Sequence, residues 1–239
     1  MATLTHQNPE PIDSEDEPLL GSPVQAVQRD GTNIYHNLVT GTATVAQAGI
    51  WVLAAVVWSG VFSDQLSFFS AHPLLNVSAL LLQVQASLIL QPTTTATPKH
   101  KHLGTRIHYI IQAISVAAFI AAFIVIEVNK GDHPHLVSPH GIMGLISYIA
   151  ILCQALVGVT QYFFPRQILG SVDAGKRIYK YHRWFGYGLM ILELATVAAA
   201  TQTTYNLTTL HIQLWAVLVA AVLVIAGVGA RIRKHKLGL

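Results

Sequence analysis

Six long apolar runs follow one another along the chain. They cover approximately residues 43–62, 72–91, 107–128, 139–162, 180–200 and 210–230. Each run has about 20 residues, the length at which a helix crosses the hydrocarbon core of a bilayer. Apolar residues are continuous within each run and do not alternate with polar ones, which excludes the strands of a membrane barrel. The pattern predicts an all-α fold, a six-transmembrane helical bundle.

The composition agrees with a membrane protein. Hydrophobic residues make up 52% of the 239 residues and charged residues only 10%, whereas soluble domains carry about 25% charged residues. The mean hydropathy is +0.49. These values exclude a secreted enzyme, a disulfide scaffold and a nucleic-acid binder. The single cysteine, Cys153, lies in the fourth run, where we expect a small buried packing residue.

The two ends of the chain differ in character from the apolar runs. Residues 1–41 contain six acidic residues and one basic residue, a composition typical of a disordered tail. Residues 42–232 form the predicted membrane domain, and residues 233–239 form a short basic tail. Within the first tail, Glu15, Leu19 and Leu20 belong to an acidic dileucine pattern. This pattern predicts contact with a sorting adaptor; the alternative is a tail that only interacts with solvent.

The distribution of basic residues predicts the orientation. Thirteen of the fourteen Lys and Arg residues lie before the first run, between the second and third runs, from the end of the fourth run to the start of the fifth, and after the sixth. The positive-inside rule therefore places both termini in the cytosol. The sequon Asn206-Leu207-Thr208 falls in a non-cytoplasmic loop, where glycosylation takes place. We expect a multi-pass protein of an endomembrane, such as the vacuole or endosome, or of the plasma membrane.

Four of the twelve histidines occupy matching positions. His72, His108, His140 and His182 lie within about one turn of the N-terminal ends of runs two to five. Runs two and four point inward, so His72 and His140 share a depth near the outer face. Runs three and five point outward, so His108 and His182 share a depth near the cytosol. A four-helix core of runs two to five then holds two stacked His–His pairs, with centres roughly 20 Å apart.

Ionisable groups inside a membrane generally mark function. Zinc sites need three or four ligands, and no acid or thiol accompanies either histidine pair. Haem iron needs only axial ligands, and the core of a helical bundle is a common place for a cofactor. We therefore predict two b-type haems, each held by two histidines and suited to electron transfer. An alternative is a haem-free transporter whose histidines move protons or metal ions.

The segments around the four histidines resemble the cytochrome b561 family of six-span di-haem electron carriers, over about residues 36–235. The matching segments are Ser70-Ala71-His72-Pro73-Leu74, Arg106-Ile107-His108-Tyr109-Ile110-Ile111-Gln112, Leu136-Val137-Ser138-Pro139-His140-Gly141 and Tyr181-His182-Arg183-Trp184-Phe185-Gly186-Tyr187. Many ascorbate-using members have Ser-Leu-His-Ser-Trp where this chain has Ser138-Pro139-His140-Gly141-Ile142. In this segment the chain is more similar to the short, tumour-suppressor-type branch.

The resemblance implies an oxidoreductase of the ascorbate ferrireductase or monodehydroascorbate reductase type. Cytosolic ascorbate, or an analogue of it, would be the donor, and monodehydroascorbate or a ferric chelate the acceptor. A further alternative is a di-haem membrane anchor for a partner enzyme. A homodimer is compatible with the sequence.

Residues at the two ends of the bundle are candidates for substrate binding. Basic residues at the cytosolic end would attract the ascorbate anion; they are Lys99, Lys101, Arg106, Lys180 and Arg183. Arg106 and Arg183 also lie beside the histidines, where they can pair with haem propionates. His133, His135 and His211 are candidates for binding an outer acceptor. Glu193, within the fifth run, is predicted to hydrogen-bond Gln83 or Gln85, with a proton-transfer role as the alternative.

Overall fold

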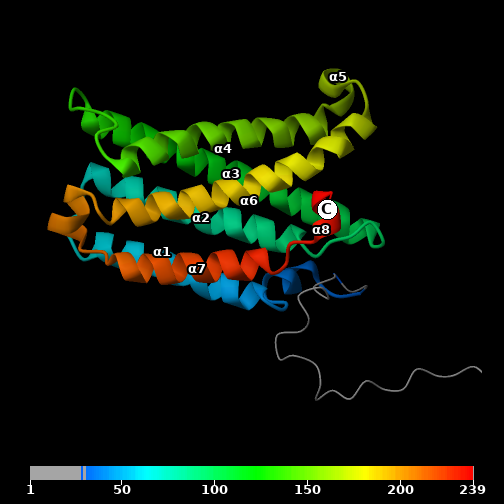
Figure 1. Ribbon diagram of the computed structural model, residues 1–239, viewed down its shortest axis with the longest axis horizontal. Helices are drawn as coiled ribbons and strands as arrows, with labels where there is room; N and C mark the ends of the chain where they lie inside the picture. Colours follow the sequence, from blue (N-terminus) through cyan, green and yellow to red (C-terminus); the bar gives the residue numbers. More distant parts are fainter. Residues whose placement is uncertain (1–27, 29–30, 239) are drawn as a thin grey trace, which may run out of the picture.

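The computed structural model describes residue 28 and residues 31–238. Six long helices run side by side along the length of the molecule (Figure 1). They are α1 (Ala43–Phe62), α2 (Ala71–Leu90), α3 (Pro98–Lys130), α4 (Pro139–Phe163), α6 (Val172–Ala200) and α7 (Leu214–Gly229). The shorter elements are the 3-10 helices η2 (Ile34–Leu38) and η3 (Phe68–Ser70), the one-turn helices α5 (Pro165–Leu169) and α8 (Lys234–Leu237), and the π-helix η4 (Asn206–Leu210). The described residues contain no strand, and the prediction of an all-α six-helix bundle is confirmed.

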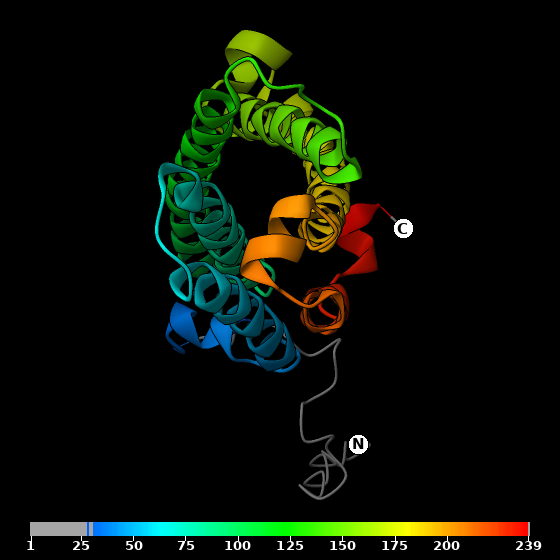
Figure 2. The same cartoon turned by 90° about the vertical axis from the view of Figure 1, so that its left-hand side faces the viewer.

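Helices α2, α3, α4 and α6 form a ring when the bundle is viewed along its length (Figure 2). Contacts join α2 to α3, α3 to α4, and α4 to α6. A hydrogen bond from Gln83 of α2 to Glu193 of α6 closes the ring. Helix α2 therefore lies diagonally opposite α4, and α3 diagonally opposite α6, as the sequence predicted. Helices α1 and α7 pack together as a pair against one side of the ring.

The outward faces of the helices are apolar. Four helical segments are long and apolar enough to span a bilayer, namely Ala43–Phe62, Phe68–Leu90, Pro98–Lys130 and Pro139–Phe163. Helix α7 is apolar but has 16 residues, and α6 has 29 residues with a charged first half. Along α4, Ile146, Ile149 and Leu156 are at least half exposed. Cys153 is also exposed on α4, so the expectation that it is a buried packing residue was wrong. These faces suit contact with lipid.

Two helices begin earlier than the apolar runs indicated. The sequence placed the starts of the third and fifth spans near residues 107 and 180, but α3 begins at Pro98 and α6 at Val172. Pro98 occupies the first turn, where its missing N–H is not needed. The Ser171 side chain accepts a hydrogen bond from the Ala174 amide and caps α6. Hydropathy detects the part of a helix that lies in lipid, whereas caps determine where the helix begins.

The turn between α6 and α7 uses the asparagine of the predicted glycosylation sequon. Asn206 is 5% exposed. Its side-chain nitrogen donates to the carbonyl oxygens of Thr201 and Ile212, and its oxygen accepts from the Ile212 amide. In the folded chain, the Asn206 side chain therefore holds the turn through three hydrogen bonds.

Helices α1 and α7 approach closely through small residues. A side chain at Gly49 would lie 2.6 Å from the Ala220 carbonyl oxygen, and one at Gly227 would overlap the backbone of Ala46. Small residues at such contacts let helix backbones pack directly in a membrane.

Within residues 1–41, which were predicted to be a disordered tail, residues 34–38 form the 3-10 helix η2 and contact α2. Ile34 and Asn37 of η2 are buried. The Asn37 side chain donates to the Ile89 carbonyl oxygen, and the Asn37 carbonyl accepts from the Arg231 guanidinium. These contacts place the described N-terminal segment at the end of the bundle that also holds α8 (Figure 1). The dileucine pattern of Glu15, Leu19 and Leu20 lies outside the described residues and remains a prediction.

Candidate functional site

His72 and His140 face each other across the ring near one end of the bundle. Each is the second residue of its helix, α2 or α4. Their ring centroids are 6.3 Å apart, and the ring planes are nearly perpendicular at 87°. Nδ1 of His72 lies 3.0 Å from the Ala122 carbonyl oxygen, and Nδ1 of His140 lies 3.0 Å from that of Thr196. A carbonyl oxygen only accepts, so Nδ1 carries the proton and the lone pair of Nε2 stays available.

His108 and His182 form the second pair, on α3 and α6. Nδ1 of His108 lies 2.9 Å from the Ala86 carbonyl oxygen. The backbone oxygen of His182 accepts a hydrogen bond from the Gln154 side chain. Nδ1 of His182 is buried and has no hydrogen-bond partner among the described residues. Gly158 lies against this ring, where an added Cβ would be 3.2 Å from Cε1.

The sequence had placed these two histidines at the starts of their helices, but the structure does not. His108 and His182 are each the eleventh residue of their helix, about three turns from its start. The reason is the early start of α3 and α6, whose first turns are polar and basic. The matched depth of the pair is unaffected, because both helices are extended by a similar length.

A common spacing of fourteen residues relates the two pairs on all four ring helices. On each helix, one position carries a histidine of one pair, and the residue fourteen positions later supports a histidine of the other pair through a hydrogen bond. These positions are His72 and Ala86 on α2, His108 and Ala122 on α3, His140 and Gln154 on α4, and His182 and Thr196 on α6. Fourteen residues of helix rise about 21 Å. The spacing agrees with the separation expected from the sequence.

The separation of the His72 and His140 rings fits two imidazoles that would bind one metal ion between them. A metal–imidazole bond of about 2.0–2.1 Å, plus about 1.1 Å from nitrogen to ring centre, puts two opposed ring centroids about 6–6.5 Å apart. The observed separation of 6.3 Å falls in this range. Hydrogen bonding of the other ring nitrogen to a carbonyl is the usual support of a ligating histidine. No cluster of three metal-ligating side chains exists within the described part of the chain. The residues therefore fit haem iron better than zinc.

Polar and aromatic side chains surround His72 and His140. Phe69 stacks on His72 with 5.6 Å between ring centroids. Asn76 donates to the His72 carbonyl oxygen and accepts from the Tyr148 hydroxyl. Sequence reasoning missed Tyr148 and Asn76, which have no motif and meet only in the folded ring.

Glu193 lies between the two levels of the ring, fully enclosed by the bundle. Its Oε2 accepts from Gln83 at 2.9 Å, while Oε1 has no partner among the described residues. Gln85 instead exchanges hydrogen bonds with Gln47 of α1. Of the two partners considered from the sequence, the structure selects Gln83.

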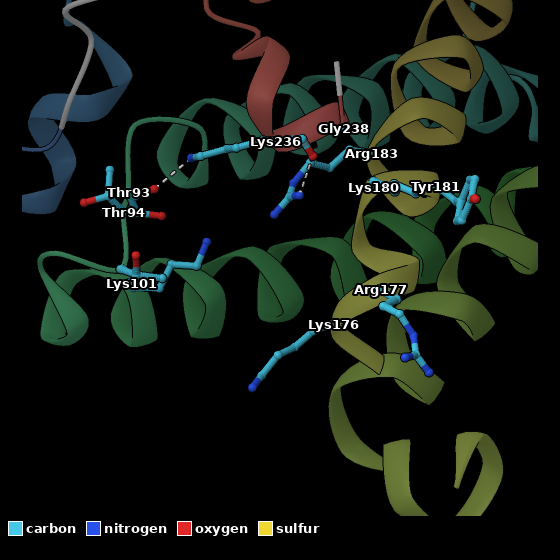
Figure 3. Close-up of a pocket in the computed structure, with 11 residues that line it drawn as sticks. Thr93, Thr94, Lys101, Lys176, Arg177, Lys180, Tyr181, Arg183, Lys236 and Gly238 are labelled. Atoms are coloured by element: carbon cyan, nitrogen blue, oxygen red, sulfur yellow. Dashed lines mark hydrogen bonds between the residues drawn. The ribbon is translucent and has the colours of Figure 1, made fainter. Parts of the chain in front are cut away.

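A basic cavity of about 740 Å³ opens at the end of the bundle nearest His108 and His182 (Figure 3). Its lining includes Lys101, Lys176, Arg177, Lys180, Arg183 and Lys236. The other described residues that line it are Thr93, Thr94, Thr95, Tyr181 and Gly238, and none of the described lining residues is acidic. Such a concentration of positive charge attracts small anions.

The predicted donor residues separate into two groups. Lys101, Lys180 and Arg183 line the cavity. Lys99 and Arg106 do not line it, and both are exposed on other parts of α3. The difference arises because residues 98–106 are helical, so their side chains point in different directions around α3. Sequence reasoning did not identify Lys236 as a residue of the cavity, because the sequence shows only a basic tail there.

The three histidines predicted at the opposite end do not assemble into a metal site among the described residues. His133 and His135 are exposed in the loop after α3. Nδ1 of His135 lies 3.4 Å from a Glu127 carboxylate oxygen, a pairing that the sequence analysis did not anticipate. His211 is exposed in a left-handed conformation after η4.

The fold and the site together define an integral membrane protein whose four-helix ring carries histidines at two levels, with His72 and His140 facing each other at one of them. A family model described as eukaryotic cytochrome b561 matches residues 71–210, which include all four histidines. The chain belongs to this family. Membership implies haem b binding and electron transfer across a membrane. No curated protein matches the chain.

Proposed function

We propose that the protein is a transmembrane oxidoreductase that passes electrons from cytosolic ascorbate to a non-cytoplasmic acceptor. The acceptor would be monodehydroascorbate or a ferric chelate. The observation that carries the proposal is the facing pair of His72 and His140, together with His108 and His182 at a second level of the same ring, about four helical turns away.

His72 and His140 would hold one b haem, and His108 and His182 the other. When bound, the two haems supply one-electron carriers near the two faces of the membrane. The backbone carbonyls of Ala86, Ala122 and Thr196 orient three of the four imidazoles. Two histidines holding each haem would leave no site on its iron for oxygen, which would suit electron transfer.

Arg106 and Arg183 are assigned to the carboxylates of the inner haem. Arg183 follows His182 directly, and one of its terminal nitrogens donates to the Lys236 carbonyl oxygen. A guanidinium has five N–H donors, so others remain for a carboxylate. Arg106 precedes His108 by two residues on the exposed side of α3.

The basic cavity supports an anionic donor at the end that carries the His108–His182 pair. The positive-inside rule assigns this end to the cytosol, since it bears nearly all the basic residues. The described ends of the chain also meet there. At the opposite end, His133, His135 and His211 remain the predicted acceptor residues.

Sealed vesicles test the proposal. The purified chain is reconstituted with ascorbate trapped inside and an impermeant ferric chelate outside, and ferrous iron is measured. We expect iron reduction far above that of protein-free vesicles, lost in His72→Ala and His182→Ala. His102→Ala, an exposed histidine outside both pairs, is the matched control and should retain activity. Wild-type vesicles that reduce iron no faster than empty ones would contradict the proposal.

A further inference from the structure

The C-terminal segment, residues 234–238, is hydrogen-bonded to α6 at the cytosolic end of the ring. The Arg183 guanidinium donates to the Lys236 carbonyl oxygen at 2.9 Å, and the Trp184 indole donates to that of Leu237 at 3.4 Å. These carbonyls belong to the end of α8, where they lack partners within the helix. The Leu237 side chain is buried. The segment is therefore held in place by α6.

The side chain of Lys236 extends from this segment to the end of α2. Its ammonium donates to the carbonyl oxygens of Gln91 and Thr93, at 3.0 and 2.8 Å. Cations are favourable at the C-terminal end of a helix, where carbonyl groups have no helical partner. An ammonium has three N–H donors. Two are used on the backbone, and one remains beside the cavity that Lys236 lines (Figure 3).

The surroundings of Lys236 are positively charged. Lys101 of α3, Arg183 of α6 and Arg233 of the tail act on it electrostatically, and Lys180 lines the same cavity. Burial first, and then these neighbouring cations, lower the pKa of Lys236 to about 7. Among the described residues, no acidic side chain lines the cavity to offset this charge. A bound anion would stabilise the protonated ammonium.

We infer that the C-terminal segment forms a wall of the cytosolic donor site and that Lys236 binds the anionic donor directly. The inference rests on the proposed function, because it identifies a further binding residue for the same small organic anion. The backbone bonds of Lys236 hold its ammonium in position. The donor then meets a preformed group, which lowers the entropic cost of binding.

Substitution of Lys236 tests the inference in the full-length, haem-loaded protein. The ascorbate concentration that gives half-maximal haem reduction (half-saturation) is measured for the wild type, Lys236→Met, Lys236→Arg and Lys99→Met. Lys99→Met is the matched control, because it removes the same charge from an exposed residue that does not line the cavity. Lys236→Met should raise the ascorbate concentration for half-maximal haem reduction about 10- to 150-fold, the loss of one charge-assisted hydrogen bond. Lys236→Arg and Lys99→Met should remain near wild type, and an uncharged quinol should reduce all four proteins alike.

The pH dependence gives a second readout that needs no variant. Because the pKa of Lys236 is lowered to about 7, its charge is present below that pH and is lost as pH rises through it. Ascorbate half-saturation of the wild type should therefore rise between about pH 6 and pH 8. Lys236→Arg, which stays charged, should show a flatter profile.

The outcomes separate the inference from the proposed function. Equal half-saturation in Lys236→Met and Lys99→Met overturns the inference and leaves ascorbate as donor. A wild type that ascorbate does not reduce overturns both. If Lys236→Met does not retain haem, the wild-type pH profile decides. A rise supports the inference, and a flat profile overturns it.

Discussion

Gly158→Ala should selectively disturb the inner histidine pair. An added Cβ at Gly158 lies 3.2 Å from Cε1 of His182, whereas ordinary contacts begin at 3.4 Å, so the ring must move away by a few tenths of an ångström. Metal sites tolerate deviations of about 0.2 Å in ligand distance. Disturbing the support of a ligand typically costs about 10- to 100-fold in metal affinity. We expect a loss of that size in affinity for the inner haem.

Gly144→Ala is the matched control for this substitution. Gly144 lies fourteen residues earlier on α4, at the level of the outer pair, and an added Cβ there is 3.9 Å from the Thr196 methyl group. Both substitutions share the usual helix stabilisation of about 0.5–1 kcal/mol for Gly→Ala. Any difference between them therefore reflects the contact with His182.

Haem content and redox spectra provide the assay. The purified variants are compared by haem-to-protein ratio and by reduced-minus-oxidised absorption. Gly144→Ala should match the wild type, and Gly158→Ala should lose inner haem or shift its band and midpoint potential. If Gly158→Ala keeps the haem content, spectrum and potential of Gly144→Ala, the assignment of His182 as a tightly placed ligand is wrong.

Three further predictions follow from the structure. Arg183→Gln should weaken ascorbate-driven reduction more than Arg106→Gln, because only Arg183 lines the cavity; haem reduction at low and high salt measures this, and equal effects would show that the cavity is not the donor site. Asn206→Ala should lower the free energy of unfolding by about 1–3 kcal/mol, since it leaves the Ile212 amide and two carbonyls unpaired. An unchanged melting temperature would refute the role of Asn206 in holding the turn between α6 and α7. Protease outside sealed right-side-out vesicles should spare both tails, and cleavage of either would refute the topology.

The sequence predicted the helices and histidines well because their signals are local. An apolar run indicates that a segment lies in lipid, and α1 begins and ends where its run does. Alternating direction of the spans places His72 and His140 at one level, as found. The starts of α3 and α6 were missed, because polar turns in water have no hydropathy signal.

Residues that act through long-range packing were beyond sequence reasoning. Lys236 reaches the cavity only because α8 docks on α6, and the local sequence does not specify that contact. The carbonyl partners of the histidines are backbone atoms, which have no residue signature. His135 was interpreted as a candidate acceptor ligand, yet its partner Glu127 lies eight residues earlier in the sequence, across a helix end.

The central claim is that two haems are held by two specific histidine pairs, and haem stoichiometry tests it most directly. Pyridine haemochromogen assay of the purified wild type should give two b haems per chain. His72→Ala and His140→Ala should each lose one haem, and His108→Ala and His182→Ala should each lose the other. The two variants of a pair should lose the same absorption band, at the same midpoint potential. A wild type with one haem, or the loss of the same haem from all four variants, would contradict the account.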